Sequence, residues 1–217
     1  MKFEKEKLIR SPFNYIGGKF KILPQIFELF PNKISMFYDI FGGGANVAVN
    51  VNADRVYYND IVDNVVEVFQ NLEGINKEKA FDKIEKIIDK YKLSKENEEG
   101  FKRCRDDYNK GNKSWDMFYT LMCFSFNNQY RFNNKKEYNS SFRKHRGCFN
   151  DVTKDKLTKF IDRLNKIDIV FDNLDFRKVD LSNANGDDLV YFDPPYLITT
   201  GNYNDGKRGF GGWNQLF

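Results

Sequence analysis

An apolar run that ends at two consecutive prolines constrains the fold of this chain more than any other feature. The run LVYF, residues 189–192, has the length and composition of a buried parallel strand, and Asp193-Pro194-Pro195-Tyr196 follows it. Each proline lacks an N–H and fixes φ at about −65°, and the residue before a proline is held extended. The strand must therefore stop at Asp193, which predicts a rigid corner at the carboxyl end of a strand, where open α/β sheets bind ligands.

This corner combines a carboxylate, carbonyls that no local helix uses and an aromatic ring. Such a set suits a flat group that bears an NH₂. The alternative is a plain turn at the end of a strand, since Asp-Pro is common in turns.

A second strand-and-turn pattern lies nearer the N-terminus. Residues 34–40 predict a strand, residues 41–45 (FGGGA) a turn, residues 46–52 a helix and residues 55–58 the next strand, which Asp60 closely follows. Strand, glycine turn and helix are typical of dinucleotide-type βαβ units, in which bare backbone approaches the ligand. An acid after the second strand is where such folds bind ribose hydroxyls, so the pattern favours a nucleoside-containing ligand.

Other classes of site are excluded. Gly17-Gly18-Lys19 resembles a phosphate loop only superficially, because no glycine lies five residues before Gly18 and no Ser or Thr follows Lys19. His145 is the only histidine, so a histidine-based triad or a multi-histidine metal site is impossible. The 3 cysteines are widely spaced and odd in number, which indicates a reducing, intracellular setting without a disulfide framework. No apolar run approaches the ~20 residues of a membrane span.

The middle of the chain reads as helical. Apolar faces recur at helical spacing from 61 to about 121, and residues 152–167 predict another amphipathic helix before a strand at 169–171. We therefore expect one domain made of residues 1–61 and 167–217, interrupted by a mostly helical insert at 62–166.

A basic stretch follows those helices. Between residues 127 and 148 its charge is +5, six basic residues against Glu137, whereas the whole chain carries 35 − 31 = +4. The aromatic residues Tyr130, Phe132, Tyr138 and Phe142 are interleaved with it. Basic, aromatic and amide side chains together suit phosphates and bases. The alternative is a solvated loop with aromatic rings packed beneath it.

Taken in order, the motifs YIGGK (15–19), DIFGGGA (39–45), YND (58–60), the basic insert and DPPY (193–196) resemble the Dam-type adenine-specific DNA methyltransferases, in their alpha arrangement. The resemblance covers residues 11–203. It implies a Rossmann-like α/β sheet that binds S-adenosylmethionine and a DNA-recognition insert. The implied activity is site-specific methyl transfer to the N6 amine of adenine in duplex DNA, as in bacterial or phage-encoded restriction-modification enzymes of the cytoplasm.

The resemblance also implies roles for individual residues. Asp193 and Pro194 would hold the target amine, and Tyr196 would stack on the flipped adenine. The residues implied for the cofactor are Tyr15, Lys19, Asp39, Phe41, Gly42, Gly44, Asp60, Asp175, Phe176 and Asp193. The residues implied for DNA are Asn128, Tyr130, Arg131, Phe132, Asn133, Lys135, Lys136 and Arg143. The sulfonium methyl is already electrophilic, so we expect no metal.

The sequence departs from the family pattern in three places. Ile40 stands where the family loop usually has proline, and Ala45 where it has its last glycine. The chain also stops at Phe217, whereas the family continues after DPPY. We therefore expect the chain alone to be slow or inactive, with a polypeptide partner supplying the C-terminal strands. Two alternatives remain: a truncated or split fragment that binds DNA without turnover, and a methyltransferase acting on RNA, the cytosine amine or protein glutamine.

Overall fold

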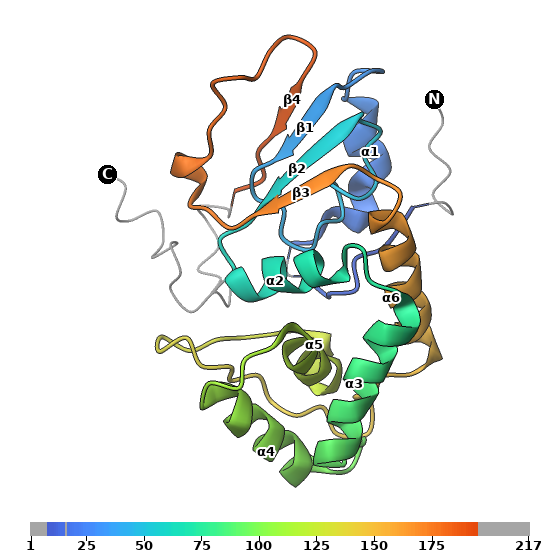
Figure 1. The fold of residues 1–217 in the computed structure, drawn as a ribbon, viewed down its shortest axis with the longest axis vertical. Helices are drawn as coiled ribbons and strands as arrows, with labels where there is room; N and C mark the ends of the chain where they lie inside the picture. Colours follow the sequence, from blue (N-terminus) through green and yellow to red (C-terminus); the bar gives the residue numbers. More distant parts are fainter. Residues whose placement is uncertain (1–7, 16, 195–217) are drawn as a thin grey trace. The chain divides into compact units, whose positions relative to one another are not determined.

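The computed structural model describes residues 8–15 and 17–194 (Figure 1). They divide into two compact units, and the division falls within helix α6 (Asp151–Leu164). The sheet unit comprises the described residues up to 74 together with 156–194, and the helical unit comprises residues 75–155. Tyr196 of the DPPY motif lies outside the described residues.

The sheet unit contains four parallel strands in the order β3-β2-β1-β4. Its elements are the 3₁₀ helix η2 (Lys19–Ile22), α1 (Leu23–Glu28), β1 (Met36–Asp39), β2 (Arg55–Asn59), α2 (Asp63–Leu72), β3 (Ile169–Asp172), the 3₁₀ helix η4 (Phe176–Lys178) and β4 (Leu189–Tyr191). A parallel sheet with α-helices between β2 and β3 is the α/β class predicted from the sequence, so the predicted fold class is confirmed.

The two faces of the sheet differ in how they are covered. The register places Asp39, Tyr58, Phe171 and Tyr191 side by side on one face. Aromatic rings pack that face, for example Phe69 of α2 against Tyr58 at 5.6 Å and against Phe171 at 5.8 Å between ring centroids. The core of the sheet unit therefore lies on this face.

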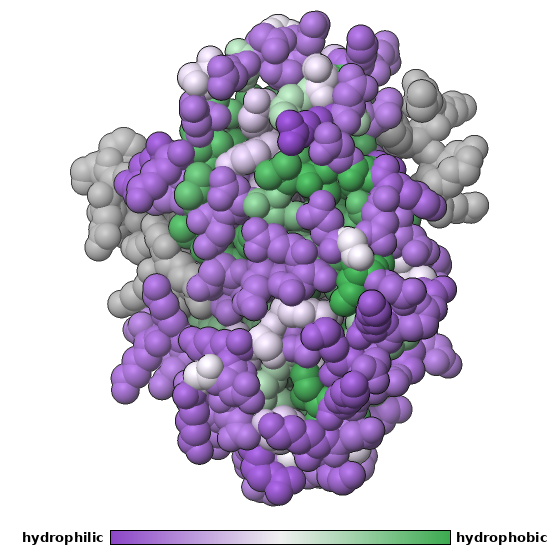
Figure 2. Space-filling model, viewed as in Figure 1, coloured by the Kyte–Doolittle hydropathy of each residue, from purple (hydrophilic) through white to green (hydrophobic). Residues whose placement is uncertain are grey.

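The opposite face carries Tyr38, Tyr57, Val170 and Val190, and 39% of Val170 is exposed. Apolar surface is visible where Figure 1 draws the strands, whereas the visible surface of the helical unit is mostly hydrophilic (Figure 2).

Two predictions from the sequence need correction. The insert was expected to begin at residue 62, but α2 packs on the sheet and belongs to the sheet unit. Residues 46–50 form turns instead of the predicted helix. The side-chain oxygens of Asn46 and Asn50 accept hydrogen bonds from the backbone N–H groups of Ser11 (3.0 Å) and Ile9 (2.7 Å). These bonds tie the turns to the segment that contains Ile9 and Ser11, and the intervening β-branched valines disfavour a helix.

The helical unit is built around α5 (Trp115–Phe124), in which every residue except Asp116 is buried. Its other elements are α3 (Lys77–Tyr91), α4 (Glu98–Asn109) and the 3₁₀ helix η3 (Phe126–Asn128). After η3 the chain forms a hairpin, with antiparallel bridges between Ser125 and Phe142 and between Phe132 and Tyr138. This is the basic stretch identified in the sequence.

Candidate functional site

The loop after β1 is held by the acid that follows β2. The buried carboxylate of Asp60 accepts a hydrogen bond from the Gly43 N–H (2.8 Å) with one oxygen and from the Val62 N–H (2.9 Å) with the other. The Tyr58 hydroxyl donates to the Gly43 carbonyl (2.6 Å). The glycine turn and the acid predicted to act together are therefore brought together at the carboxyl edge of the sheet.

The glycines of this loop are needed because aromatic rings lie against it. A Cβ atom on Gly42 would lie 2.1 Å from the Tyr58 ring. Gly43 has φ of +50°, and a Cβ there would lie 2.9 Å from the ring of Tyr15. Only glycine adopts this conformation without strain and leaves the backbone this bare. Tyr15, one of the residues implied for the cofactor, thus packs over the loop.

The corner after β4 meets the start of η2. The Lys19 ammonium lies 2.5 Å from a carboxylate oxygen of Asp193, and both side chains are largely buried. Lys19 also donates to the Gly17 carbonyl (3.1 Å). Asp193 and Pro194 are half-buried at the end of the described residues. Two residues far apart in the sequence, from the first and last motifs, are therefore paired at one site.

Asp39 is the last residue of β1. The strand order places it between Asp60, which follows β2, and Asp193, which follows β4. Only 1% of Asp39 is exposed, and neither carboxylate oxygen makes a hydrogen bond among the described residues. Burial is the main reason why the pKa of Asp39 rises from 3.8 to about 8, and the nearby charges of Asp193 and Asp60 add to the shift. The Ala48 N–H, whose contact with the carboxyl falls outside hydrogen-bond geometry, and the charge of Lys19 lower the pKa without compensating for these two causes. Asp39 is therefore protonated at neutral pH.

Aromatic side chains from three strand ends meet beside the loop. Phe41, after β1, lies 5.2 Å from Phe176 of η4 and 6.2 Å from Phe192, which follows β4 and is 52% exposed. Asp175 forms a bidentate pair with Arg177, with N–O distances of 2.8 and 2.6 Å, which lowers the pKa of Asp175 to about 2. Phe41, Asp175 and Phe176, all implied for the cofactor, thus lie together.

These residues fit a cationic nucleoside ligand. The loop offers bare backbone, the phenylalanine cluster offers apolar faces for a base, and the orphaned Asp39 carboxyl lies between two further carboxylates. A buried polar group without a partner calls for an explanation, and a bound cation supplies one. The residue set therefore matches S-adenosylmethionine, which carries a base, a ribose and a sulfonium.

The aromatic residues of the hairpin are packed beneath it. Tyr130 is 8% and Phe132 5% exposed, and their rings pack on Phe118 of α5 at 5.4 and 5.9 Å. Tyr138 closes the cluster at 5.7 Å from Phe132. The rings are packed under the hairpin, as in the alternative given in the sequence analysis, because burying large apolar rings is more favourable than leaving them in water. The contact of Tyr130 and Phe132 with DNA stays a prediction.

The polar and basic side chains do remain at the surface. Arg131, Lys135 and Lys136 are exposed, whereas Asn128, Asn133 and Arg143 are half-buried. Arg131 donates to the side chain and the carbonyl of Asn139 (2.9 and 3.1 Å), and Arg143 donates to the Asn128 side chain. The charge of this stretch is thus presented by an ordered hairpin.

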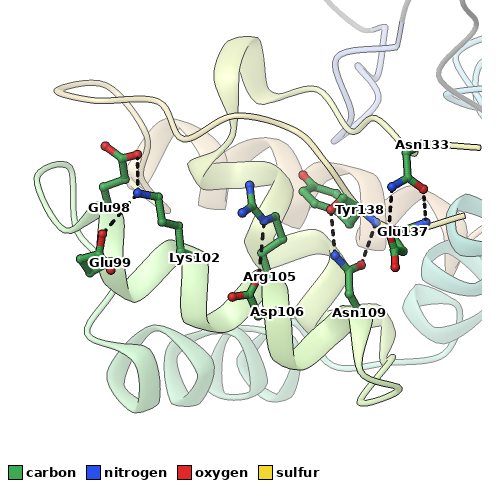
Figure 3. A network of polar contacts seen from close by, with 9 residues as sticks. All are labelled: Glu98, Glu99, Lys102, Arg105, Asp106, Asn109, Asn133, Glu137 and Tyr138. Atoms are coloured by element: carbon green, nitrogen blue, oxygen red, sulfur yellow. Dashed lines mark hydrogen bonds and ion pairs between the residues drawn. The ribbon is translucent and has the colours of Figure 1, made fainter. Parts of the chain in front are cut away.

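A polar network fixes that hairpin to α4 (Figure 3). Asn109, the last residue of α4, accepts from the Tyr138 N–H (2.7 Å) and donates to the Tyr138 carbonyl (3.0 Å). Across the turn, the Asn133 amide donates to the Glu137 carboxylate (2.7 Å). The exposed tip around Lys135 and Lys136 is therefore held by side chains on both sides of the turn.

The sequence analysis missed Phe126. It is 61% exposed at the base of the hairpin, and Asn127 and Asn128 beside it have left-handed φ values of +57° and +51°. Non-glycine residues in that region are uncommon, and asparagine is among the few that adopt it readily. The exposure of Phe126 could not be predicted from the apolar pattern, because Phe126 follows the apolar run of α5 and the pattern predicts that it is buried with that run. The pair Asn127-Asn128, which tolerates a left-handed turn, is the clue that was available.

The charge state of Asp39 makes the stability of the protein depend on pH. Between pH 4 and pH 8, approximately, the unfolded chain has lost the proton that native Asp39 keeps, so stability falls as pH rises through this range. Asp39→Asn should be spared this loss and be more stable than wild type by about 1–3 kcal/mol at pH 8. Urea unfolding at pH 5 and pH 8 should show the gain growing with pH, and an equal gain at both values would contradict this origin.

Comparison with known proteins agrees with this geometry. Residues 15–210 match the family model of D12 class N6 adenine-specific DNA methyltransferases. The chain is 49% identical to Type II methyltransferase M.FokI of Planomicrobium okeanokoites over 99% of its own length and 33% of the relative. It is 45% identical to Modification methylase StsI of Streptococcus sanguinis over 97% of its own length and 32% of the relative. It is also 28% identical to the DNA adenine methylase of Haemophilus influenzae, over 88% of its own length and 66% of that protein.

The chain thus spans about a third of the length of the first two relatives. Among the described residues, no helix combines the length and apolarity that a membrane crossing requires. The match to the family model covers every motif from YIGGK to DPPY. The chain belongs to the D12 class of N6 adenine-specific DNA methyltransferases.

Proposed function

We propose that this chain carries the cofactor site, the catalytic corner and the recognition hairpin of a site-specific methyltransferase that modifies the N6 amine of adenine in duplex DNA. The observation that carries the proposal is the position of Asp193, at a proline-locked strand end beside Lys19, next to the loop that Asp60 holds. A carboxylate at that corner adjoins both the cofactor residues and the route by which a base enters.

The cofactor would be held at the carboxyl edge of the sheet. When bound, S-adenosylmethionine supplies an electrophilic methyl group. The carboxylate of Asp60 would accept hydrogen bonds from the ribose hydroxyls. The phenylalanine cluster would flank the adenine of the cofactor, and Asp175 would accept its amine. Tyr15, Lys19, Gly42 and Gly44 would line the methionine end.

Asp193 and Pro194 would position the target amine. The adenine amine is a poor nucleophile because its lone pair conjugates with the ring. Hydrogen bonds from that amine to the Asp193 carboxylate and the Pro194 carbonyl favour a more tetrahedral nitrogen, aimed at the methyl. Because Asp193 is already fixed by Lys19, this is electrostatic preorganisation. Tyr196 would stack on the flipped base, which offsets part of the few kcal/mol that flipping costs.

The hairpin would be the DNA contact. Arg131, Lys135 and Lys136 supply exposed charge for phosphates and base edges, and Asn128, Asn133 and Arg143 supply polar groups beside it. Phe126 would stack on a base, because its ring is 61% exposed whereas the ring of Phe132 is buried.

A polypeptide partner remains part of the proposal. Within the described residues β4 pairs with β1 alone, so one edge of β4 is open to a further strand. The second candidate function, a fragment that binds DNA without turnover, rests on this open edge. The bacterial modification methylases among the relatives suggest a role in restriction-modification in the cytoplasm.

We expect Asp60→Ala to weaken S-adenosylmethionine binding by about 1–3 kcal/mol, because two ribose hydroxyls lose their acceptor. Isothermal titration calorimetry measures the change. Asp172→Ala, which removes the acid at the end of β3 that accepts from the Tyr57 hydroxyl (2.9 Å), is the matched control. Unchanged affinity in a folded Asp60→Ala protein would exclude the ribose role.

We expect Asp193→Ala to cut turnover by ~10²-fold or more, the scale of losing one preorganised electrostatic group. Labelled-methyl transfer to duplex DNA, RNA and protein, followed by nucleoside analysis, identifies the product and separates the alternative substrates. Asp180→Asn, which changes an exposed carboxylate of the same unit, is the control. Each assay is run with and without a polypeptide covering the C-terminal part of a longer relative. Full turnover by Asp193→Ala in either arm would refute its role.

We expect replacement of Lys135 and Lys136 by Ala to weaken binding to all duplexes alike. The slope of log K against log salt should become shallower by up to about two units, since each phosphate contact releases counterions. Replacing the exposed Lys83 and Lys86 of α3 removes the same charge from the same unit and is the control. Equal effects of the two pairs would show that the hairpin has no special role.

A further inference from the structure

The buried carboxyl of Asp39 is not explained by the fold. Its side chain lies on the packed face of the sheet, in line with Tyr58, Phe171 and Tyr191, and it has no hydrogen-bond partner in the part of the chain that the structure describes, which is costly for a buried acid. A hydrophobic residue of similar size would pack there at lower cost. The presence of an acid at this buried position is therefore better explained by a property of the ligand that binds beside it.

The strand order places Asp39 at the centre of the site. In the order β3-β2-β1-β4, Asp60 follows β2, Asp39 ends β1 and Asp193 follows β4, so Asp39 lies between the other two along the edge. In the donor, the sulfur joins the ribose C5′ to the transferable methyl. If Asp60 binds the ribose and Asp193 the amine that receives the methyl, the group between them faces the sulfur.

We propose that Asp39 is the residue that distinguishes the charged methyl donor from its neutral product: its carboxyl loses a proton to solvent when the sulfonium binds, and the resulting carboxylate favours the cation over the uncharged thioether. This inference rests on the proposed cofactor site. It assigns to Asp39 a specificity role that acts through charge.

The groups facing Asp39 support this behaviour. Asp193 and Asp60 face it with negative charge, and Lys19 is the cation among the groups that act on it. Tyr58 is also close, but burial raises the pKa of its phenol far above neutrality, so it stays uncharged. A third carboxylate in this cluster is unfavourable until a further positive charge arrives, and a sulfonium supplies that charge. The pKa of Asp39 then falls, and its proton is released.

Calorimetry measures both the release of the Asp39 proton and the preference for the charged donor over the neutral product. Wild type and Asp39→Asn are titrated with S-adenosylmethionine, with the neutral product S-adenosylhomocysteine, and with sinefungin, which carries an amine on the carbon that replaces the sulfur. Titrations at pH 7 in two buffers of different ionisation enthalpy count the protons released. The amine of each ligand titrates with both proteins, so the difference between the proteins isolates Asp39.

We expect wild type to release close to one more proton than Asp39→Asn on binding S-adenosylmethionine or sinefungin, but not the product. The difference should vanish at pH 9, where free Asp39 is already ionised. In Asp39→Asn, the preference for donor over product should fall about tenfold or more, the scale of one partly buried ion pair. Asp188→Asn, at the opposite end of the sheet where its carboxylate accepts from the Met36 N–H (3.0 Å), should change neither quantity.

Other outcomes would overturn the proposal. Equal proton counts for donor and product in wild type show that the sulfonium does not face Asp39. An unchanged preference in Asp39→Asn shows that Asp39 does not set it. Should Asp39→Asn fail to fold, the proton counts of wild type at pH 7 and pH 9 decide alone. Failure of wild type to bind any of the three ligands would instead refute the proposed cofactor site.

Discussion

The carboxylate of Asp60 is the interaction on which the geometry of the cofactor edge depends. Its two oxygens accept from the Gly43 N–H and the Val62 N–H, so one side chain joins the loop after β1 to the start of α2. Because that loop is packed between the rings of Tyr58 and Tyr15, it has no alternative position. The carboxyl edge of the sheet is therefore ordered before a ligand binds. The entropy cost of ordering this loop is met during folding, so it does not weaken ligand binding.

Much of this edge could be predicted from local sequence. Prolines end a strand wherever they occur, and a glycine turn after a buried strand has few conformations, so Asp193 and Gly43 lie at strand ends as expected. The parallel sheet follows from strands separated by helices. These features are determined by the conformational preferences of neighbouring residues, which can be deduced from one sequence.

The other features of the site depend on contacts between residues that are distant in the sequence, and local patterns do not predict such contacts. The pairing of Lys19 with Asp193 and the isolation of Asp39 arise only when η2, β1 and β4 meet. The resemblance implied that Phe132 contacts DNA and gave no role to Phe126, whereas the structure buries Phe132 and exposes Phe126, because the hairpin folds back on α5. A short apolar pattern does not reveal which of two rings a neighbouring helix will cover.

The burial of Phe132 and the exposure of Phe126 bear on how the hairpin can evolve. Its stability comes from Tyr130, Phe132 and Tyr138 beneath it and from Asn109 beside it, whereas Lys135 and Lys136 at its tip have no part in the core. Substitutions at exposed positions of this kind usually change stability by less than about 0.5 kcal/mol. Descendants of this protein can therefore vary the tip without losing the fold that presents it, and under the proposed function such changes would alter the contact with DNA.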